Sequence, residues 1–234
     1  MVLETSCCSW VCDLSVTSSV VRLSNIGGIM KKGLVFVFLM ICLIMALIFC
    51  VNHTSLKHDV KLFICTTTIN NFSDNGEIYF LRGNEYFFKR QYDLAIEDYT
   101  NAIYNNFNDA RVYRNRGGAY HFKKQEDLAI ADYTKAIDLD PKDAKTYFGR
   151  GFSYKDKEQY ELAIADVGKA IELDPKFSEA YLYQGYLYKL QNLNQDAIKS
   201  YKSLIKNVPN DVKSVEEAKK RIEELGGGGV ASDF

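Results

Sequence analysis

Apolar and polar positions repeat along the chain with a period of 34 residues between residues 76 and 211. The stretch from Ala144 to Phe177 matches the one at 110–143 when it is shifted by 34 residues, and further shifts reach copies at 76–109 and 178–211. Each copy contains two helical halves, so the pattern predicts eight consecutive helices. A fixed period of this length indicates a repeat architecture, in which neighbouring units bury each other's apolar faces.

Sets of in-phase residues indicate how the two helices of a copy meet. A tyrosine opens the first helix, a glycine follows four residues later, and a second tyrosine comes three residues after the glycine. Glycine inside a helix costs about 1 kcal/mol relative to alanine, so its recurrence indicates close approach by the second helix. The second helix carries an in-phase alanine and ends at a proline, because the residue before proline is pushed out of the helical conformation. The members of these sets are Tyr79, Tyr113, Tyr147 and Tyr181; Gly83, Gly117, Gly151 and Gly185; Tyr86, Tyr120, Tyr154 and Tyr188; Ala95, Ala129, Ala163 and Ala197; and Pro141, Pro175 and Pro209, with Phe107 in place of the first proline.

This pattern resembles the tetratricopeptide repeat family, and the resemblance covers residues 76 to 225. It implies an all-α fold, a right-handed superhelix (α-solenoid) of four helix pairs at 76–109, 110–143, 144–177 and 178–211. It also implies that the concave face of the superhelix binds peptides or protein surfaces. The resemblance does not identify the partner.

A ninth helix is expected after the last copy, at residues 212–225. Val215, Ala218, Ile222 and Leu225 fall at helical spacing and form one apolar stripe. A solenoid needs such a capping helix to cover its last open face. A run of four glycines then ends the helix, and residues 226–234 are expected to form a flexible tail.

An apolar run at 34–51 follows two lysines and is long enough to cross a bilayer as a transmembrane helix. This layout is typical of a signal peptide or a signal anchor. The end of the run lacks small residues at alternate positions, and the bulky Phe49 before Cys50 disfavours lipidation of that cysteine. The sequence therefore predicts an uncleaved signal anchor at 30–52, with a cleaved signal and a lipidated Cys50 as alternatives.

The segments on either side of this anchor carry separate predictions. Residues 1–29 have no periodic pattern, and we expect either a disordered tail or a mis-called extension that precedes a start at Met30. Residues 53–75 are expected to form a stalk, in which 60–65 is a short strand or packs onto the first repeat. The basic residues near the run are slightly more numerous before it than after it, which favours a cytoplasmic N-terminus. The prediction is a single-pass membrane protein with its repeats outside the cytoplasm.

Composition and candidate chemistry exclude several classes of function. The formal net charge is -1, so no strong attraction to nucleic acid is predicted. All six cysteines precede the repeats, and no set of cysteines and histidines completes a metal site. Glu97, Asp98 and Asp132 recur in phase on second helices and are expected to form a solvated face. We therefore expect no cofactor, no metal and no enzymatic activity.

In the family, the first helix of each copy lines the inner groove, one turn away from the packing tyrosines. The matching positions of this chain mix aromatic rings, amides and cations, and they include Phe87 and His121. Aromatic surface with cations beside it suits an extended peptide that carries acidic groups or a free carboxylate. The resemblance thus implies a peptide-binding groove lined by Phe80, Asn84, Arg111, Arg114, Asn115, Lys145, Phe148, Phe152, Lys155 and Tyr186.

A sharper hypothesis follows from those family members that hold a C-terminal carboxylate in a clamp of two lysines, two asparagines and one arginine. Asn84, Asn115 and Lys145 match three of these places, whereas Phe80 and Gly149 replace the other lysine and the arginine.

The sequence predicts a membrane-anchored scaffold that binds another protein through its concave groove. The alternatives are a secreted or periplasmic soluble adaptor, and a cytosol-facing chaperone or import co-receptor with a partial clamp.

Overall fold

The computed structural model describes residues 54–71 and 75–226, and the regular secondary structure in these ranges is helical throughout. The predictions for residues 1–29, for the anchor at 30–52 and for the tail beyond residue 226 lie outside the described residues. Among the residues that are described, no helix is both long enough and apolar enough to cross a membrane.

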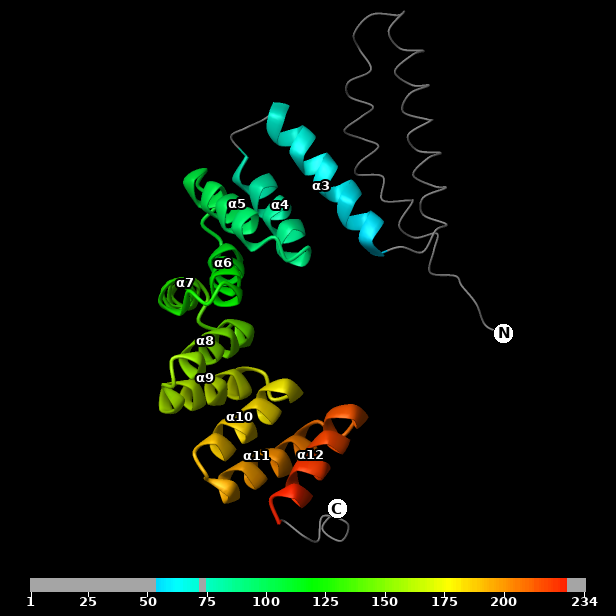
Figure 1. Cartoon of the computed structure of the whole chain (residues 1–234), viewed down its shortest axis with the longest axis vertical. Coiled ribbons are helices and arrows are strands. Elements are labelled where there is room, and N and C mark those ends of the chain that lie inside the picture. Colours follow the sequence, from blue (N-terminus) through cyan, green and yellow to red (C-terminus); the bar gives the residue numbers. More distant parts are fainter. Residues whose placement is uncertain (1–53, 72–74, 227–234) are drawn as a thin grey trace, which may run out of the picture. The chain divides into compact units, whose positions relative to one another are not determined.

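Four helix pairs follow one another in the described chain (Figure 1). They are α4 (Gly76–Phe88) with α5 (Tyr92–Tyr104), α6 (Ala110–Phe122) with α7 (Glu126–Leu139), α8 (Ala144–Asp156) with α9 (Tyr160–Leu173), and α10 (Ser178–Leu190) with α11 (Asn194–Asn207). The two helices of each pair pack against each other, and the second helix of each of the first three pairs also contacts the first helix of the next pair. The helix-pair solenoid predicted from the 34-residue period is therefore confirmed.

The recurring glycines lie where the second helix of each pair approaches most closely. All four are buried. A Cβ atom added at Gly185 would lie 2.3 Å from a ring carbon of Tyr201, and one added at Gly83 would lie 2.8 Å from a ring carbon of Tyr99. At Gly117 and Gly151 the nearest atoms would be 3.2 Å and 3.0 Å away. The predicted close approach is confirmed, and it is tightest in the first and last pairs.

An ion pair joins the two helices in each of the first three pairs. An arginine on the first helix donates two hydrogen bonds to an aspartate on the second helix, with N–O distances of 2.7 to 2.8 Å. This two-point geometry uses the planar fork of the guanidinium group, and such charge-assisted hydrogen bonds are stronger than neutral ones. The pairs are Arg82–Asp98, Arg116–Asp132 and Arg150–Asp166.

These ion pairs correct one prediction about the second helices. Asp98 and Asp132 were expected on a solvated face, but they are only 2% and 7% exposed. Glu97, by contrast, is exposed, as predicted. The aspartates tolerate burial because each has an arginine partner, which offsets the cost of removing a charge from water.

The in-phase tyrosines form the side walls of the arginine sites. The Cζ atom of each arginine lies 5.7 to 5.9 Å from the ring centroids of the two tyrosines on its own helix. This distance lies within the range of a cation–π interaction. The six rings are half-buried. They are Tyr79 and Tyr86, Tyr113 and Tyr120, and Tyr147 and Tyr154.

A third partner ties each of two arginine sites to the preceding pair. Arg116 Nη1 lies 3.1 Å from Thr100 Oγ1, and Arg150 Nη1 lies 3.1 Å from Thr134 Oγ1. The threonines belong to α5 and α7, which are the second helices of the preceding pairs. One arginine side chain therefore connects three helices.

The fourth pair replaces this arrangement by a neutral one. Gln184 stands at the arginine position, Ser200 at the aspartate position and Gly168 at the threonine position. The Ser200 hydroxyl donates a hydrogen bond to Gln184 Oε1, with an O–O distance of 2.9 Å. The contact between α10 and α11 is thus maintained by shorter side chains.

The helix after the last pair, α12 (Val212–Glu224), packs against α10 and α11. Ala218 and Ile222 are fully buried, and Val215 and Leu225 pack at the edge of the same core. The predicted apolar stripe therefore faces the repeats.

The segment before the first repeat is a helix, α3 (Thr54–Asn71), so the prediction of a short strand at 60–65 is wrong. The His58 ring stacks on Phe88 with centroids 3.6 Å apart, and its Nδ1 atom pairs with Glu85. Ile69 is 8% exposed. The other expectation for 60–65 was packing onto the first repeat; Lys61 lies 3.6 Å from Glu85 of α4, whereas Phe63 and Ile64 are exposed.

Helix α3 follows the same 34-residue phase as the second helices of the repeats. Asp59 pairs with Lys89, the residue that follows α4. The Asp93–Lys123 and Asp127–Lys157 pairs have the same separation along the chain and link a second helix to the end of the next first helix. Helix α3 therefore supplies a contact that the second helix of a preceding repeat would make.

The glycine contacts lead to a test with a matched control. Gly185→Ala should lower the free energy of unfolding by about 1–3 kcal/mol, because the new methyl group overlaps the Tyr201 ring. Gly168 is also helical, but its Cβ would meet only the end of Gln184, at 3.5 Å. Gly168→Ala should therefore stabilise the protein by about 0.5–1 kcal/mol. Urea unfolding followed by circular dichroism measures both, and similar changes in the two variants would contradict the close approach at Gly185.

Candidate functional site

A continuous band of aromatic rings runs across the first helices of the four pairs and the adjoining turns. Neighbouring rings have centroids 4.0 to 6.1 Å apart, which is about the range for interacting aromatic pairs. We call this set the aromatic band. Its members are Phe87, Tyr92, His121, Phe122, Phe148, Phe152, Phe177, Tyr183 and Tyr186.

The N-terminal part of the band joins the first two pairs. Tyr92 and Phe122 stack face to face, with centroids 4.9 Å apart and an interplanar angle of 5°. Phe87 meets both rings edge-on, at 5.6 and 5.7 Å. Phe122 is 55% exposed, so this part of the band offers a large apolar surface to a ligand.

The C-terminal part of the band joins the last two pairs. Phe152 stacks on Tyr183 with centroids 4.0 Å apart. Phe148 meets Phe152 edge-on at 4.9 Å and approaches Phe177 to 4.7 Å. These four rings are half-buried, so each is packed against neighbours and retains some accessible surface.

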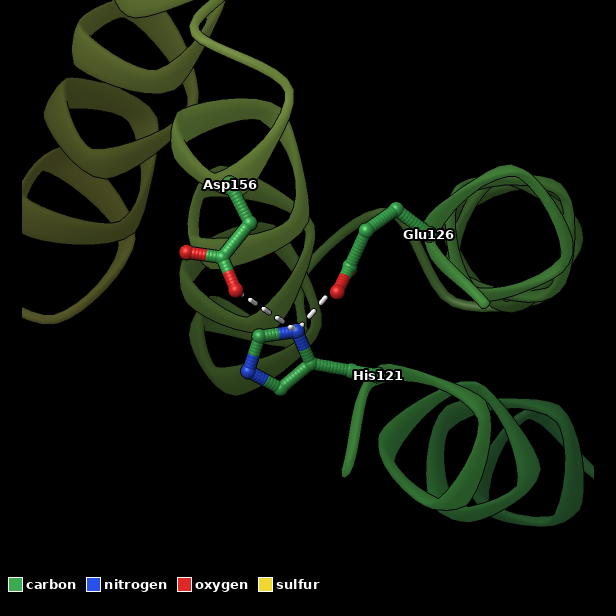
Figure 2. Close-up of side chains that lie close together, drawn as sticks. All are labelled: His121, Glu126 and Asp156. Carbon is green, nitrogen blue, oxygen red and sulfur yellow. Dashed lines mark hydrogen bonds and ion pairs between the residues drawn. The ribbon is translucent and has the colours of Figure 1, made fainter. Parts of the chain in front are cut away.

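His121 connects the two parts of the band. Its ring centroid lies 5.8 Å from Phe122 and 6.1 Å from Phe152. Figure 2 shows its Nδ1 atom directed toward two carboxylates, Glu126 at 2.9 Å and Asp156 at 4.0 Å. The imidazole is thus held by an acid from α7 and an acid from α8.

The same three side chains have the composition of a metal site, since their ligand atoms lie within 4.8 Å of one another. However, both oxygens of Asp156 already accept hydrogen bonds from ammonium groups, Lys124 at 2.9 Å and Lys155 at 3.1 Å. Burial raises the pKa of Asp156, but these lysines outweigh that effect and hold its pKa below the usual range. A metal ion would have to displace both cations. We therefore interpret the cluster as an ionic network that positions His121.

Most of the predicted groove cations are paired with acids of the chain itself. Arg114 Nη1 lies 2.5 Å from Asp143 Oδ2. Arg111 donates from Nε and Nη2 to Asp109, at 2.9 and 2.6 Å. Lys155, as described, is bound to Asp156. Lys145 is exposed and has no ion-pair partner among residues 54–71 and 75–226.

The Arg114–Asp143 pair also helps to fix the start of α8. Asp143 is the N-cap residue, and its side chain accepts hydrogen bonds from the Lys145 backbone N–H and the Thr146 hydroxyl. Burial raises the pKa of Asp143, but the hydrogen bonds from Thr146 and Arg114 dominate and keep its pKa below the ordinary value. Arg114 is therefore part of the fold, as well as lying at a predicted groove position.

The remaining predicted residues divide between the core and an amide pair. Phe80 is 7% exposed and packs against Tyr99 and Phe107, so the prediction that it lines the groove is wrong. Asn84 Oδ1 accepts hydrogen bonds from Asn115 Nδ2 at 2.8 Å and from the Tyr99 hydroxyl at 2.9 Å. The two asparagines of the hypothetical clamp are thus bonded to each other.

The structure brings five residues at predicted groove positions together in the aromatic band, namely Phe87, His121, Phe148, Phe152 and Tyr186. Tyr183 contacts Phe148, Phe152 and Tyr186 but was not predicted, although it is in phase with Asn115, a predicted groove residue. Its spacing of three residues from Tyr186 was the available signal. Tyr92, Phe122 and Phe177 were also missed, since they lie in or beside the turns.

Comparison with known proteins gives the same architecture. Crystal structures of MamA and of YrrB, which is described as a TPR protein with an unusual peptide-binding site, are 22% and 20% identical to this chain, with TM-scores of 0.61 and 0.59. The MamA match covers 72% of this chain and 98% of MamA, and the YrrB match covers 70% and 84%. A further MamA structure, from Desulfovibrio magneticus RS-1, is 18% identical, covers 64% of this chain and 85% of its own, and has a TM-score of 0.60. These likenesses concern the fold. No curated protein gives a significant match.

Family models give the assignment directly. Models of the tetratricopeptide repeat match residues 76–109, 110–143, 144–177 and 168–199. Together the matches cover more than half of the 234 residues. The chain therefore belongs to the tetratricopeptide repeat family.

Proposed function

We propose that this protein is a scaffold that binds an extended segment of a partner protein along the aromatic band. The observation that carries this proposal is the continuity of the band, whose ring contacts connect all four helix pairs. Large aromatic side chains dominate binding energy at protein interfaces, because they bury much area with little loss of conformational freedom. YrrB combines the same architecture with a peptide-binding site, and this supports assigning such a role to the present chain.

The charges beside the band define the chemistry of the segment. Arg111, Arg114 and Lys155 are each paired with an aspartate, so an acidic ligand would have to compete with those groups. Lys145 lacks such a partner among the described residues and lies one turn before Phe148 on α8. We propose a ligand with apolar or aromatic anchors and one acidic group, or a free carboxylate, that pairs with Lys145.

The partial carboxylate clamp is a second form of this proposal. Lys145 would be its one cation, because Phe80 is buried and Gly149 has no side chain to reach a ligand. Asn84 and Asn115 would have to exchange their mutual hydrogen bond for one to the ligand. The ring contacts therefore favour recognition through apolar side chains over a clamp.

We also propose a single-pass membrane location with the repeats outside the cytoplasm. The support is the apolar run at 34–51 and the basic residues before it. Protease added to intact cells should then digest the repeats while a tag at the N-terminus stays protected. Protected repeats would indicate the cytosol-facing co-receptor, and recovery of the chain in the soluble fraction would indicate the secreted or periplasmic adaptor.

Substitution in the band tests the proposed binding surface. Peptides selected from a random library on the full chain should be enriched in apolar anchors with an acidic residue. Phe152→Ala should weaken the selected peptides by about 2 kcal/mol or more, the range for a central interface residue, which is roughly 30-fold in Kd. Tyr104→Ala is the control, since Tyr104 is 84% exposed on α5 and outside the band. Isothermal titration calorimetry measures both variants, and equal affinities would place binding elsewhere.

The role of Arg114 is tested through stability and its pH dependence. Arg114→Ala leaves the partly buried Asp143 without its ion pair and should cost about 1.5–3 kcal/mol of unfolding free energy at pH 7. Because the pKa of Asp143 is lowered in the folded protein, this stabilisation is present above the unfolded pKa of about 3.9. It is lost as the pH falls through the folded pKa. The difference between wild type and variant should therefore shrink below about pH 4.

Lys145→Ala is the matched control for Arg114. It removes a cation with no partner in the described chain, so its unfolding free energy should change by less than about 0.5 kcal/mol. Its effect should appear in the affinity for acidic peptides and fade as salt screens the charge. Stability losses of equal size in the two variants would contradict the assignment of Arg114 to the fold.

A further inference from the structure

The first three helix pairs each contain a guanidinium site on their second-helix side. The site consists of two tyrosine rings from the first helix, an aspartate from the second helix and, in the second and third pairs, a threonine from the preceding pair. The chain fills each site with its own arginine. The three occupied sites therefore indicate that this arrangement of side chains binds a guanidinium group.

The fourth pair keeps the two rings but lacks the group between them. Tyr181 and Tyr188 occupy the tyrosine positions, while glutamine, serine and glycine replace the arginine, aspartate and threonine. The shorter side chains leave a cavity of about 350 Å³ between α9, α10 and α11. Its lining includes both tyrosines and all three replacements, Gln184, Ser200 and Gly168. The cavity thus lies where the filled sites hold their arginine.

We propose that this cavity binds the guanidinium group of an arginine side chain presented by a partner protein. The half-buried Tyr188 ring would stack on the planar cation, as tyrosine rings do in the other three pairs, and the buried Tyr181 ring would close the cavity beside it. Gln184 Oε1 accepts one hydrogen bond, from Ser200. An amide oxygen has two lone pairs, so it can still accept one from an incoming guanidinium group. The proposal concerns a site separate from the aromatic band and does not depend on it.

One acidic and one basic side chain line the cavity. Asp196 lines the cavity at a position where the first three copies carry Leu94, Leu128 and Leu162. Asp196 lies one helical turn before Ser200, the residue that replaces the aspartate of the first three pairs. The cavity therefore still has one carboxylate in its lining. Lys199 also lines the cavity and opposes a cation. Both are exposed, and the lysine head group can turn toward solvent on its flexible stem.

The rigidity of one wall supports a preformed site. The Tyr181 hydroxyl accepts a hydrogen bond from Asn207 Nδ2 at 2.8 Å and lies 3.3 Å from the backbone oxygen of Pro175. Tyr181 is 3% exposed, so its ring is held in place without a ligand. Binding therefore loses little conformational freedom at this wall, which favours affinity.

The experiment uses the full chain with ring-labelled tyrosine and follows the signals of Tyr181 and Tyr188 by NMR. The probe is arginine blocked at both ends as an N-acetyl amide, which represents a residue within a partner chain. It should shift both signals saturably. The citrulline and lysine analogues should bind about tenfold more weakly, because citrulline lacks the charge and lysine lacks the planar fork. Equal binding of citrulline, or tighter binding of a blocked glutamate, would overturn the proposal.

A second arm distinguishes a partner's arginine from the free amino acid. Free L-arginine carries additional charges at its α-amino and α-carboxyl groups. It should bind no more tightly than the blocked compound if the site receives a side chain from a protein. Free arginine that binds about tenfold more tightly would overturn the partner assignment, since that factor requires recognition of the α-groups.

The decisive variant restores the pair that the other copies contain. Gln184→Arg combined with Ser200→Asp should fill the cavity from within, raise the melting temperature and abolish binding of blocked arginine. Gly168→Thr narrows the cavity from α9 and gives a second variant if the double substitution does not fold. Asp196→Asn should weaken binding about two- to fivefold, as expected for an exposed charge. Undiminished binding by the filled or narrowed variant would overturn the proposal.

Discussion

The ion pair between the two helices is the interaction on which the first three repeats of this structure most depend. Arg116 illustrates it, with two hydrogen bonds to Asp132, two flanking tyrosines and a hydrogen bond to Thr100 of the preceding pair. A buried charge without partners would destabilise the fold, so each member of this group requires the others. The spacing of the repeat supplies all of them in phase. The interaction thus sets both the packing within a pair and the attachment of one pair to the next.

This arrangement leaves the opposite side of the first helices free for other chemistry. The rings of the aromatic band also join neighbouring pairs, but they are not the sole contacts between them, because the arginines and tyrosines link the helices on the other side. Phe122 is accordingly exposed over half of its surface, although it stacks on Tyr92. The hydrogen bond between His121 and Glu126 fixes the middle of the band. The framework and the candidate binding surface therefore use different residues of the same helices.

The sequence predicted the helix pairs and the glycine contacts well, because these depend on local spacing. It failed where the outcome depended on which partner a side chain meets. Asp98 was expected in solvent, but Arg82 on the neighbouring helix neutralises it and permits burial. Arg114 was expected to be available to a ligand, but Asp143, which is 29 residues away in the chain, is bound to it. The period alone does not say which of the in-phase charges meet across two helices, so the pattern could not reveal these pairings.

The two ends of the described repeats are held by different forces. At the C-terminal end, α12 buries Ala218 and Ile222 completely. At the N-terminal end, α3 is attached to the first pair by polar contacts, such as Asp59–Lys89, and by the His58–Phe88 stack. In a stack where each repeat contacts only its neighbours, unravelling starts at the weaker end and proceeds helix by helix. Disassembly of this fold should therefore have a direction, from α3 toward α12.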